Sequence, residues 1–293
     1  MYLRPGTLDE AVAALAAPGG RILAGGTDIF PAAGDQPLAG PIIDISRLAE
    51  LDGIVRSESE IRIGARTSWS TIIATKLPRC FDALKAAARE VGSVQIQNLG
   101  TIAGNLCNAS PAADGVPPLL ALDAEVELRS RAGTRTLPLS DFIAGNRRTT
   151  RREDEIVTAV TVPRTIDAGA STFLKLGARR YLVISIAMVA AVVDADAEGR
   201  VAQARIAVGS CSAVAQRLTA LEQELVGAPA HPGLGALARP EHLAPLSPID
   251  DVRASAAYRL DAALTLVRRA LDACAPQAWT PQAWPPQAWT KEI

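Results

Sequence analysis

Residues 94–123 read VQIQNLGTIAGNLCNASPAADGVPPLLALD, and within them Thr101–Asn105 forms a segment of small residues. A comparable segment, Leu23–Asp28, reads LAGGTD. Each follows an apolar, strand-like run, and the glycines let the main chain approach an anionic ligand and present several N–H groups. The threonine hydroxyls and the Asn105 amide add donors that carry no charge. We therefore expect two loops that hold a diphosphate from two sides, as in a nucleotide cofactor site.

Neither segment matches the familiar nucleotide-binding motifs. The sequence has no G-x-G-x-x-G after a first strand and no G-x-x-x-x-G-K-[ST], which disfavours a Rossmann unit and a P-loop. An alternative is that Gly25-Gly26 forms an ordinary turn after a strand. A nucleotide that binds here would therefore be held by another fold.

The two segments resemble those of the medium, flavin-binding subunit of the molybdenum hydroxylases, a family that includes xanthine dehydrogenase and aerobic carbon monoxide dehydrogenase. That family carries an A-G-G-T-D-type loop near its start, then T-I-G-G-N and S-P-x-x-D. This chain has Ala24–Asp28, Thr101–Asn105 and Ser110–Asp114 in the same order. Ala103 replaces a glycine of the family pattern, which permits close packing but removes some backbone freedom.

The resemblance covers nearly the whole chain before its tail. Phe173–Arg180 is similar to the family's entry into its C-terminal domain, and Asp251–Arg259 is similar to the start of its last helix. It implies an α+β protein with a two-part FAD-binding domain of the vanillyl-alcohol-oxidase-like type and a smaller α+β C-terminal domain, which has a three-stranded sheet plus helices. The expected parts are an FAD-binding domain over 1–169, a C-terminal domain over 170–275 and a Pro/Trp repeat tail over 276–293.

Caps, turns and apolar periodicity predict the individual elements. Thr7, with Glu10 three residues later, is a capping box for the first helix. The apolar run Tyr181–Val193 is too short to span a bilayer and reads as a buried strand. We expect helices over 8–17, 68–74, 81–90, 117–122, 218–225 and 250–274. We expect strands over 21–24, 41–44, 60–64, 125–130, 171–176, 183–194 and 201–208.

The resemblance also implies the cofactor-binding residues. The first segment would wrap the diphosphate and adenosine side, the second would donate to the diphosphate and ribityl chain, and the S-P-x-x-D residues would bind hydroxyls. An aliphatic side chain and a lysine farther along would lie against the flavin. The implied residues are Leu23, Ala24, Gly25, Gly26, Thr27, Asp28, Thr101, Gly104, Asn105, Ser110, Asp114, Val157 and Lys175.

Several of these residues have alternative interpretations. Asp28 either caps the following turn or accepts from a ribose hydroxyl, and Asp114 could instead cap the helix after it. Lys175 is either a cation that stabilises the anionic reduced flavin or a solvated lysine beside a strand. Arg179 and Arg180 could face a partner or a nicotinamide substrate.

Metal and acid–base chemistry find little support in the sequence. The cysteines show no C-x-x-C pair, so we expect no zinc or iron–sulfur ligation by this chain. Cys107, inside the second segment, is either a small filler or a catalytic thiol. The only histidines, His231 and His242, lie in a proline-rich connector, which argues against a histidine base. We therefore predict no catalytic residue and no metal site, and a bound flavin would carry the redox chemistry.

Composition limits the partners. The net charge of −1 gives no electrostatic footprint for nucleic acid or anionic membranes, and 48% hydrophobic residues suffice for sizeable cores. The start, Met1–Pro5, has no signal-peptide pattern, so a cytoplasmic protein is expected. The tail repeats Pro-Gln-Ala-Trp and is either a docking strap for a partner or a repeat expansion with little structure.

The resemblance finally implies the role of the chain. It would be the FAD-carrying electron-transfer subunit of a heterotrimeric molybdenum hydroxylase, assembled as a dimer of heterotrimers. A large partner would carry the molybdenum cofactor and a small partner the [2Fe-2S] clusters, and electrons would pass through FAD to NAD or another acceptor. Two alternatives are a self-sufficient FAD-dependent oxidoreductase and a non-catalytic partner-binding protein.

Overall fold

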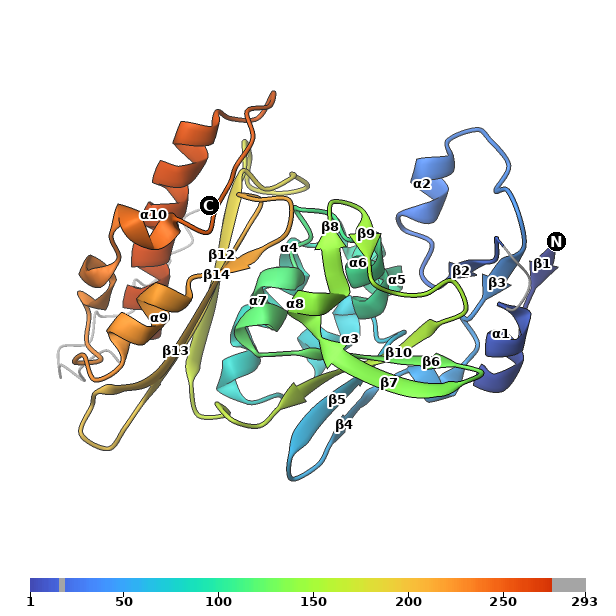
Figure 1. Cartoon of the computed structure of the whole chain (residues 1–293), viewed down its shortest axis with the longest axis horizontal. Coiled ribbons are helices and arrows are strands. Elements are labelled where there is room, and N and C mark those ends of the chain that lie inside the picture. Colours follow the sequence, from blue (N-terminus) through green and yellow to red (C-terminus); the bar gives the residue numbers. More distant parts are fainter. Residues whose placement is uncertain (16–18, 276–293) are drawn as a thin grey trace, which may run out of the picture.

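The computed structural model describes residues 1–15 and 19–275. Three sheets follow one another along the long axis of the molecule, and helices pack between and outside them (Figure 1). The predicted repeat tail over 276–293 and the last residues of the first predicted helix lie outside the described residues.

The N-terminal unit is a small parallel sheet in the order β1-β3-β2. Thr7 caps its first helix by accepting from the Glu10 amide, while the Glu10 carboxylate reaches the Gly6 amide, one residue before the expected partner. Ile43 and the apolar face of that helix form its core. Its elements are β1 (Tyr2–Leu3), α1 (Leu8–Ala14), β2 (Arg21–Leu23), α2 (Ile29–Ala33) and β3 (Ile42–Asp44).

The middle unit is an antiparallel sheet in the order β4-β5-β10-β6-β7, covered by short helices. Its central strand, β10 (Ile156–Pro163), was not predicted, although its β-branched sequence and its nearly complete burial suit a central strand. The other strands are β4 (Ile54–Arg56), β5 (Glu60–Gly64), β6 (Glu125–Ser130), β7 (Gly133–Pro138), and the separate hairpin β8 (Ile143–Gly145) and β9 (Arg148–Thr149). The helices are α3 (Trp69–Ala74), α4 (Asp82–Glu90), α5 (Val94–Leu99), α6 (Ile102–Asn108), α7 (Val116–Ala121) and α8 (Leu139–Phe142), with 3₁₀ turns η1 (Ala49–Leu51) and η2 (Arg79–Phe81).

The second small-residue segment is the start of a helix and not a loop. Thr101 is the N-cap of α6 and its hydroxyl accepts from the Gly104 amide at 3.1 Å. The strand-like run before it is also helical, since it forms α5. Val94 and Leu99 on that helix are exposed, so the alternation of apolar residues did not mark a buried strand face.

The C-terminal unit has four strands in the order β11-β12-β13-β14, so the predicted three-stranded sheet has a further two-residue edge strand. Its strand β12 begins at Ala187 and not at residue 183 as predicted. The residues before it form a loop, in which Tyr181, Leu182 and Ile184 are exposed. The last helix begins at Ala256, after a turn. Its elements are β11 (Ala170–Leu176), β12 (Ala187–Ala195), β13 (Val201–Gly209), β14 (Gln216–Arg217), α9 (Thr219–Leu225), η3 (Leu234–Leu237), η4 (Pro240–Leu243) and α10 (Ala256–Cys274).

Charged side chains join the middle and C-terminal units. Asp123, just beyond α7, pairs with Arg205 at 3.0 Å and with Arg217 at 2.6 Å, and Arg217 also pairs with Glu222. This network holds α7 against β13 and thereby orients the segment before α7. The predicted domain boundary at residues 169 and 170 falls between β10 and β11 and stays a prediction.

Candidate functional site

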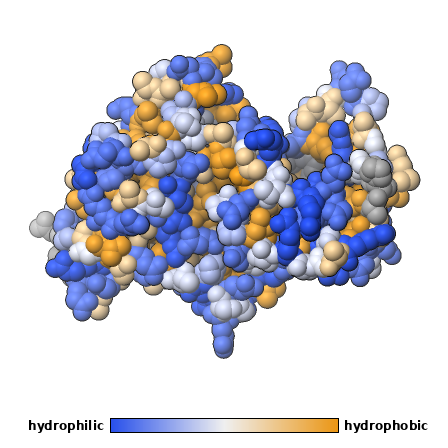
Figure 2. Space-filling view, in the orientation of Figure 1, coloured by the Kyte–Doolittle hydropathy of each residue, from blue (hydrophilic) through white to orange (hydrophobic). Residues whose placement is uncertain are grey.

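A cavity of about 780 Å³ lies where the β2–α2 and α5–α6 segments meet. Figure 2 shows the surface hollowed between the lobe that carries α2 and the middle of the molecule. The loop before β12 contributes to one wall of the cavity through Leu182, Val183 and Ile184. All three units therefore contribute to its lining.

Most of the residues predicted for the site line this cavity. Two do not: Leu23 is buried in β2, and Lys175 points to Asp114 from β11. The predicted residues that line the cavity are Ala24, Gly25, Gly26, Thr27, Asp28, Thr101, Gly104, Asn105, Ser110, Asp114 and Val157.

The two glycine-containing segments meet by direct backbone contact. A Cβ atom at Gly25 would lie 1.9 Å from the carbonyl oxygen of Leu99, well inside any permitted contact. Gly26 has a φ of +72°, and a Cβ there would meet the Phe30 ring at 2.5 Å. Only glycine lets the β2–α2 segment approach α5 this closely, so the backbone itself forms that part of the cavity wall.

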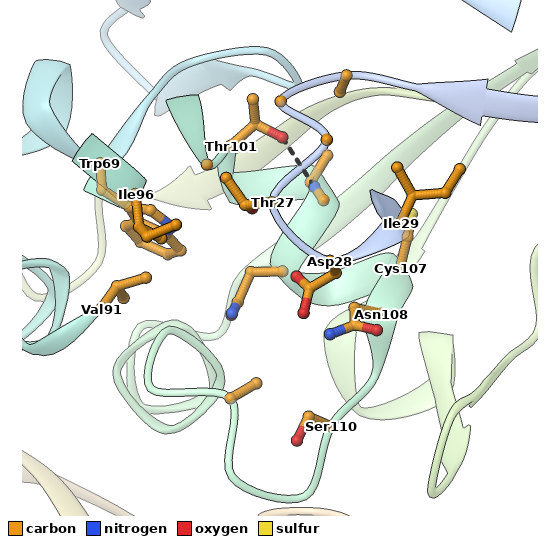
Figure 3. Close-up of a pocket in the computed structure, with 18 of the residues that line it drawn as sticks. Thr27, Asp28, Ile29, Trp69, Val91, Ile96, Thr101, Cys107, Asn108 and Ser110 are labelled. Carbon is orange, nitrogen blue, oxygen red and sulfur yellow. Dashed lines mark hydrogen bonds between the residues drawn. The ribbon is translucent and has the colours of Figure 1, made fainter. Parts of the chain in front are cut away.

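Polar side chains line the cavity, and some of them have no hydrogen-bond partner among the described residues. The Oδ1 atom of Asn105 is buried and has no hydrogen-bond partner among the described residues. Asp28 occupies the N-cap position of α2 but makes no side-chain capping bond, so the capping interpretation is wrong. Figure 3 shows Thr27, Asp28 and Ser110 around the same hollow. These groups can bind a ligand that offers both hydrogen-bond donors and acceptors.

Apolar side chains gather on one side of the cavity. Trp69 is 1% exposed and lies under the main chain, since a Cβ at Gly115 would be 2.5 Å from its ring. Figure 3 shows Trp69, Ile96 and Val91 close together on that side. Sequence reasoning missed these residues, because only the tertiary contact between α3 and α5 places them there. The wall suits a flat ring system.

A buried ion pair closes another side. The Nζ atom of Lys175 lies 2.9 Å from Asp114 Oδ2, and the Ser185 hydroxyl donates to Oδ1 at 3.2 Å. The two charged side chains are 7% and 10% exposed, so the interpretation of Lys175 as a solvated lysine is wrong. Gly115 and not Asp114 holds the N-cap position of α7. Burial raises the pKa of Asp114 to about 6, although the charge of Lys175 opposes this shift.

Two arginines missed by the site prediction, Arg147 and Arg151, also line the cavity. Their segment is held by Glu155, which is buried and pairs with Arg135 at 2.6 Å and with Arg152 at 2.7 Å. Burial alone would raise the pKa of Glu155, but hydrogen bonds from these arginines hold it at about 2. A carboxylate that stays ionised at neutral pH therefore holds the basic segment Arg147–Arg152 in place.

Cys107 lines the cavity (Figure 3) and is exposed there, so it is not a small buried filler. Desolvation raises the pKa of its thiol, which argues against a nucleophile. Within residues 1–15 and 19–275, no three His, Cys, Asp or Glu side chains come together as metal ligands. None of the helices in the same ranges is long and apolar enough to cross a membrane.

Comparison with known proteins shows similarity over both halves of the chain. The family model for the FAD binding domain in molybdopterin dehydrogenase matches residues 1–165, and that for the CO dehydrogenase flavoprotein C-terminal domain matches residues 172–274. The nicotinate dehydrogenase FAD-subunit of Eubacterium barkeri is 38% identical over 78% of this chain and 80% of its own length. The xanthine dehydrogenase FAD-binding subunit of Escherichia coli O157:H7 is 31% identical over 92% and 94%.

Solved structures show the same similarity. A chain of the carbon monoxide dehydrogenase from Hydrogenophaga pseudoflava superimposes with a TM-score of 0.83 at 30% identity, covering 93% of this chain and 96% of its own. A chain of quinoline 2-oxidoreductase from Pseudomonas putida 86 superimposes with a TM-score of 0.84 at 26% identity, covering 94% of this chain and 96% of its own.

Gly25→Ala should destabilise the chain by about 1–3 kcal/mol or more, because the added methyl group overlaps the Leu99 carbonyl and forces the two segments apart. Urea denaturation of the purified protein measures this change. Gly6→Ala is the matched control, since a Cβ there meets only the flexible Glu10 carboxylate at 3.5 Å. Equal free energies of unfolding for the two variants would contradict the backbone contact.

Asp114→Asn should change how stability depends on pH. Because the folded-state pKa lies above the ordinary value of 3.8, the folded chain binds a proton more tightly than the unfolded chain does. The resulting stabilisation is complete below the unfolded-state pKa and is lost as the pH rises through about 6. Urea denaturation between about pH 4 and pH 7 should show this fall in the wild type and not in the variant. A difference between the two proteins that is constant with pH would refute the assignment.

Proposed function

Because the chain belongs to the family of FAD-binding subunits of molybdenum hydroxylases, we propose that it passes electrons from [2Fe-2S] clusters on a partner subunit to NAD or another acceptor. The chain is an oxidoreductase subunit with an FAD-binding domain, as its relatives are. We propose that the domain spans 1–169, followed by a C-terminal domain over 170–275 and the separate tail.

The observation that carries the proposal is the cavity between two glycine-containing backbone segments. It fits FAD on three counts: bare backbone at Gly25 and Gly26, an unsatisfied buried acceptor on Asn105, and an apolar wall around Trp69. A dinucleotide needs all three, since it combines a diphosphate, hydroxyl groups and flat rings.

We assign the holding residues by their chemistry. The amides of Ala24–Asp28, with that of Thr101, would bind the diphosphate, and Asn105 would accept from a hydroxyl or amide of the cofactor. The Gly104 amide already donates to the Thr101 hydroxyl, so Gly104 would contribute a stretch of wall without a side chain. Ser110 and Asp114 would bind hydroxyl groups, and Val157 would pack against a ring. The cofactor supplies the redox chemistry when bound, since its ring system takes up and releases electrons.

Lys175 acts in this proposal through its partner. It does not line the main cavity, and its charge is balanced by Asp114 at 2.9 Å. The pair therefore presents a carboxylate whose pKa burial raises to about 6 and whose charge at neutral pH is balanced by Lys175, rather than a bare cation as expected from the sequence. In this proposal, Trp69 and the apolar residues around it also exclude water from the cavity. A polar contact between protein and cofactor is stronger where water is excluded.

The partners follow from the family. We propose a large subunit with the molybdenum cofactor and a small iron–sulfur subunit, assembled as a dimer of heterotrimers. The names of the relatives refer to nicotinate, xanthine and carbon monoxide, so the substrate changes while this subunit is retained. Substrate choice therefore belongs, in our proposal, to the molybdenum-bearing partner.

The visible spectrum tests the proposal. The chain purified alone and supplied with FAD should show flavin bands at stoichiometric occupancy that acid releases, and co-expression with the neighbouring genes should add iron–sulfur absorbance and molybdenum. Flavin without these partners would favour a self-sufficient flavoenzyme. A chain that stays colourless even in a complex would refute FAD binding.

Asn105→Ala should weaken FAD binding by about 5- to 30-fold, since a buried acceptor loses its ligand partner. The free energy of unfolding without cofactor should not fall, because Asn105 Oδ1 has no protein partner to lose. Calorimetric titration with FAD and urea denaturation measure the two quantities. Asn98→Ala is the control, as Asn98 accepts from Ser70 on the exposed side of α5 and lies outside the cavity. Equal affinities for the two variants would contradict the role of Asn105.

A further inference from the structure

Arg259, in the first turn of α10, is buried although it is charged and lies outside the cavity lining. Its side chain is 3% exposed. Nη1 donates to the carbonyl oxygens of Ile186 at 2.6 Å and Ser210 at 3.2 Å, and Nη2 donates to Asp251 at 2.7 Å. Burying a guanidinium costs free energy that these three partners offset, although Nε has no hydrogen-bond partner among the described residues. The position of Arg259 is therefore tightly defined by three separate elements.

Both carbonyl groups are linked to the same wall of the cavity, one through the neighbouring residue Ser185 and the other through the Ser210 amide. Ile186 follows Ser185, whose hydroxyl donates to Asp114 at 3.2 Å. The amide of Ser210 donates to the carbonyl oxygen of Pro111 at 3.0 Å. Pro111 and Asp114 lie in the segment 110–114, four of whose five residues line the cavity. Two short chains of hydrogen bonds thus run from one guanidinium to one wall segment.

The backbone conformation of Ser210 is a second indication that its contacts hold this arrangement in place. Its φ of +62° places a non-glycine residue in the left-handed region, which costs free energy unless neighbouring contacts hold it there. The contacts that hold it are the Pro111 carbonyl on its amide and Arg259 on its carbonyl. Loss of either contact would let this peptide relax and move away from the 110–114 segment.

The outer end of the arrangement is a surface turn. Asp251 accepts from the Arg253 amide at 2.8 Å and from Arg253 Nη1 at 2.9 Å, in addition to Arg259. The Arg253 amide and the two guanidinium groups hold the pKa of Asp251 at about 2, so its charge persists at neutral pH. Val252, between these residues, is 99% exposed. The turn therefore presents its tip to solvent while its carboxylate fixes a buried arginine.

We propose that Arg259 is a positioning residue for the cofactor cavity: through Ile186 and Ser210 it fixes the segment 110–114, and with it the Asp114–Lys175 pair. This proposal rests on the proposed function, in which FAD occupies the cavity. The planar guanidinium serves two carbonyls and a carboxylate at once, which the point charge of a lysine does not. The surface turn at Asp251 is thereby coupled to the cavity.

Arg259→Lys is the main test, and Arg253→Lys is its matched control, because Arg253 shares Asp251 but reaches neither carbonyl. The first variant should weaken FAD binding by roughly 2- to 30-fold, the range that packed networks transmit. It should also shift the midpoint potential of the bound flavin, measured by spectroelectrochemistry. The control should match the wild type in both. Asp251→Asn, which keeps the arginine, should give a smaller change in the same direction.

A further variant separates the specific effect of Arg259→Lys from general destabilisation of the chain. Leu221→Ala removes a fully buried side chain of α9 and should lower stability by about 2–5 kcal/mol without contact to the 110–114 segment. It should leave the potential unchanged. In a Ser185→Ala background, Arg259→Lys should have a reduced effect, since one of its two routes is already cut. An unchanged potential and affinity in Arg259→Lys, or an equal shift in Leu221→Ala, would overturn the proposal.

A cofactor-free readout separates this proposal from the proposed function. In the chain without FAD, Arg259→Lys should speed hydrogen exchange at the Ala112 and Ala113 amides, which bond to Ser110 within the segment. If the wild type fails to bind FAD but this exchange still rises, the proposed function fails and the positioning role stands. If FAD binds and the exchange is unchanged, the positioning role fails.

Discussion

A side chain at position 25 would overlap the carbonyl oxygen of Leu99, so the β2–α2 and α5–α6 segments can meet only as bare backbone. This contact joins the parallel N-terminal unit to the antiparallel middle unit. It also decides what the cavity offers a ligand, because main chain without side chains lines the cavity at Gly25 and Gly26. The cap at Thr101 and the ring of Trp69 beneath Gly115 then fix the remaining walls around that contact.

Two carboxylates near the cavity, those of Glu155 and Asp114, are held by partners, and the difference between their partners sets the electrostatic character of two sides of the cavity. Glu155 holds the basic segment Arg147–Arg152 and stays ionised at neutral pH. Burial, in contrast, raises the pKa of Asp114 to about 6. The difference arises from the number of donors: Glu155 receives two guanidinium groups and a backbone amide, and Asp114 receives one ammonium and one hydroxyl. One side of the cavity is therefore supported by ion pairs of Glu155 that stay charged at neutral pH. Another side carries the carboxyl group of Asp114, which titrates near pH 6.

The sequence predicted the elements with clear local signals and missed those defined by tertiary contact. Thr7 caps the first helix as expected, and β5 and β6 have their predicted bounds, because caps and alternation act over a few residues. Most of the residues that the motif resemblance implied line the cavity. It could not find Trp69 or Arg151, which no local pattern marks, and it gave Lys175 and Asp114 without the ion pair between them. The apolar run before β12 was wrongly predicted as strand because hydrophobicity alone does not distinguish a buried strand from an exposed loop.

The contacts that complete the cavity join residues far apart along the chain. Asp114 meets Lys175 and Ser185, and Pro111 meets Ser210, so the wall built on the first half depends on residues from the second. A ribosome makes the chain from the N-terminus, so the first 165 residues leave it before β12 and β13 do. The wall is therefore incomplete throughout most of synthesis. Its assembly is a late event of biogenesis, so the complete cavity exists only once the C-terminal strands have left the ribosome.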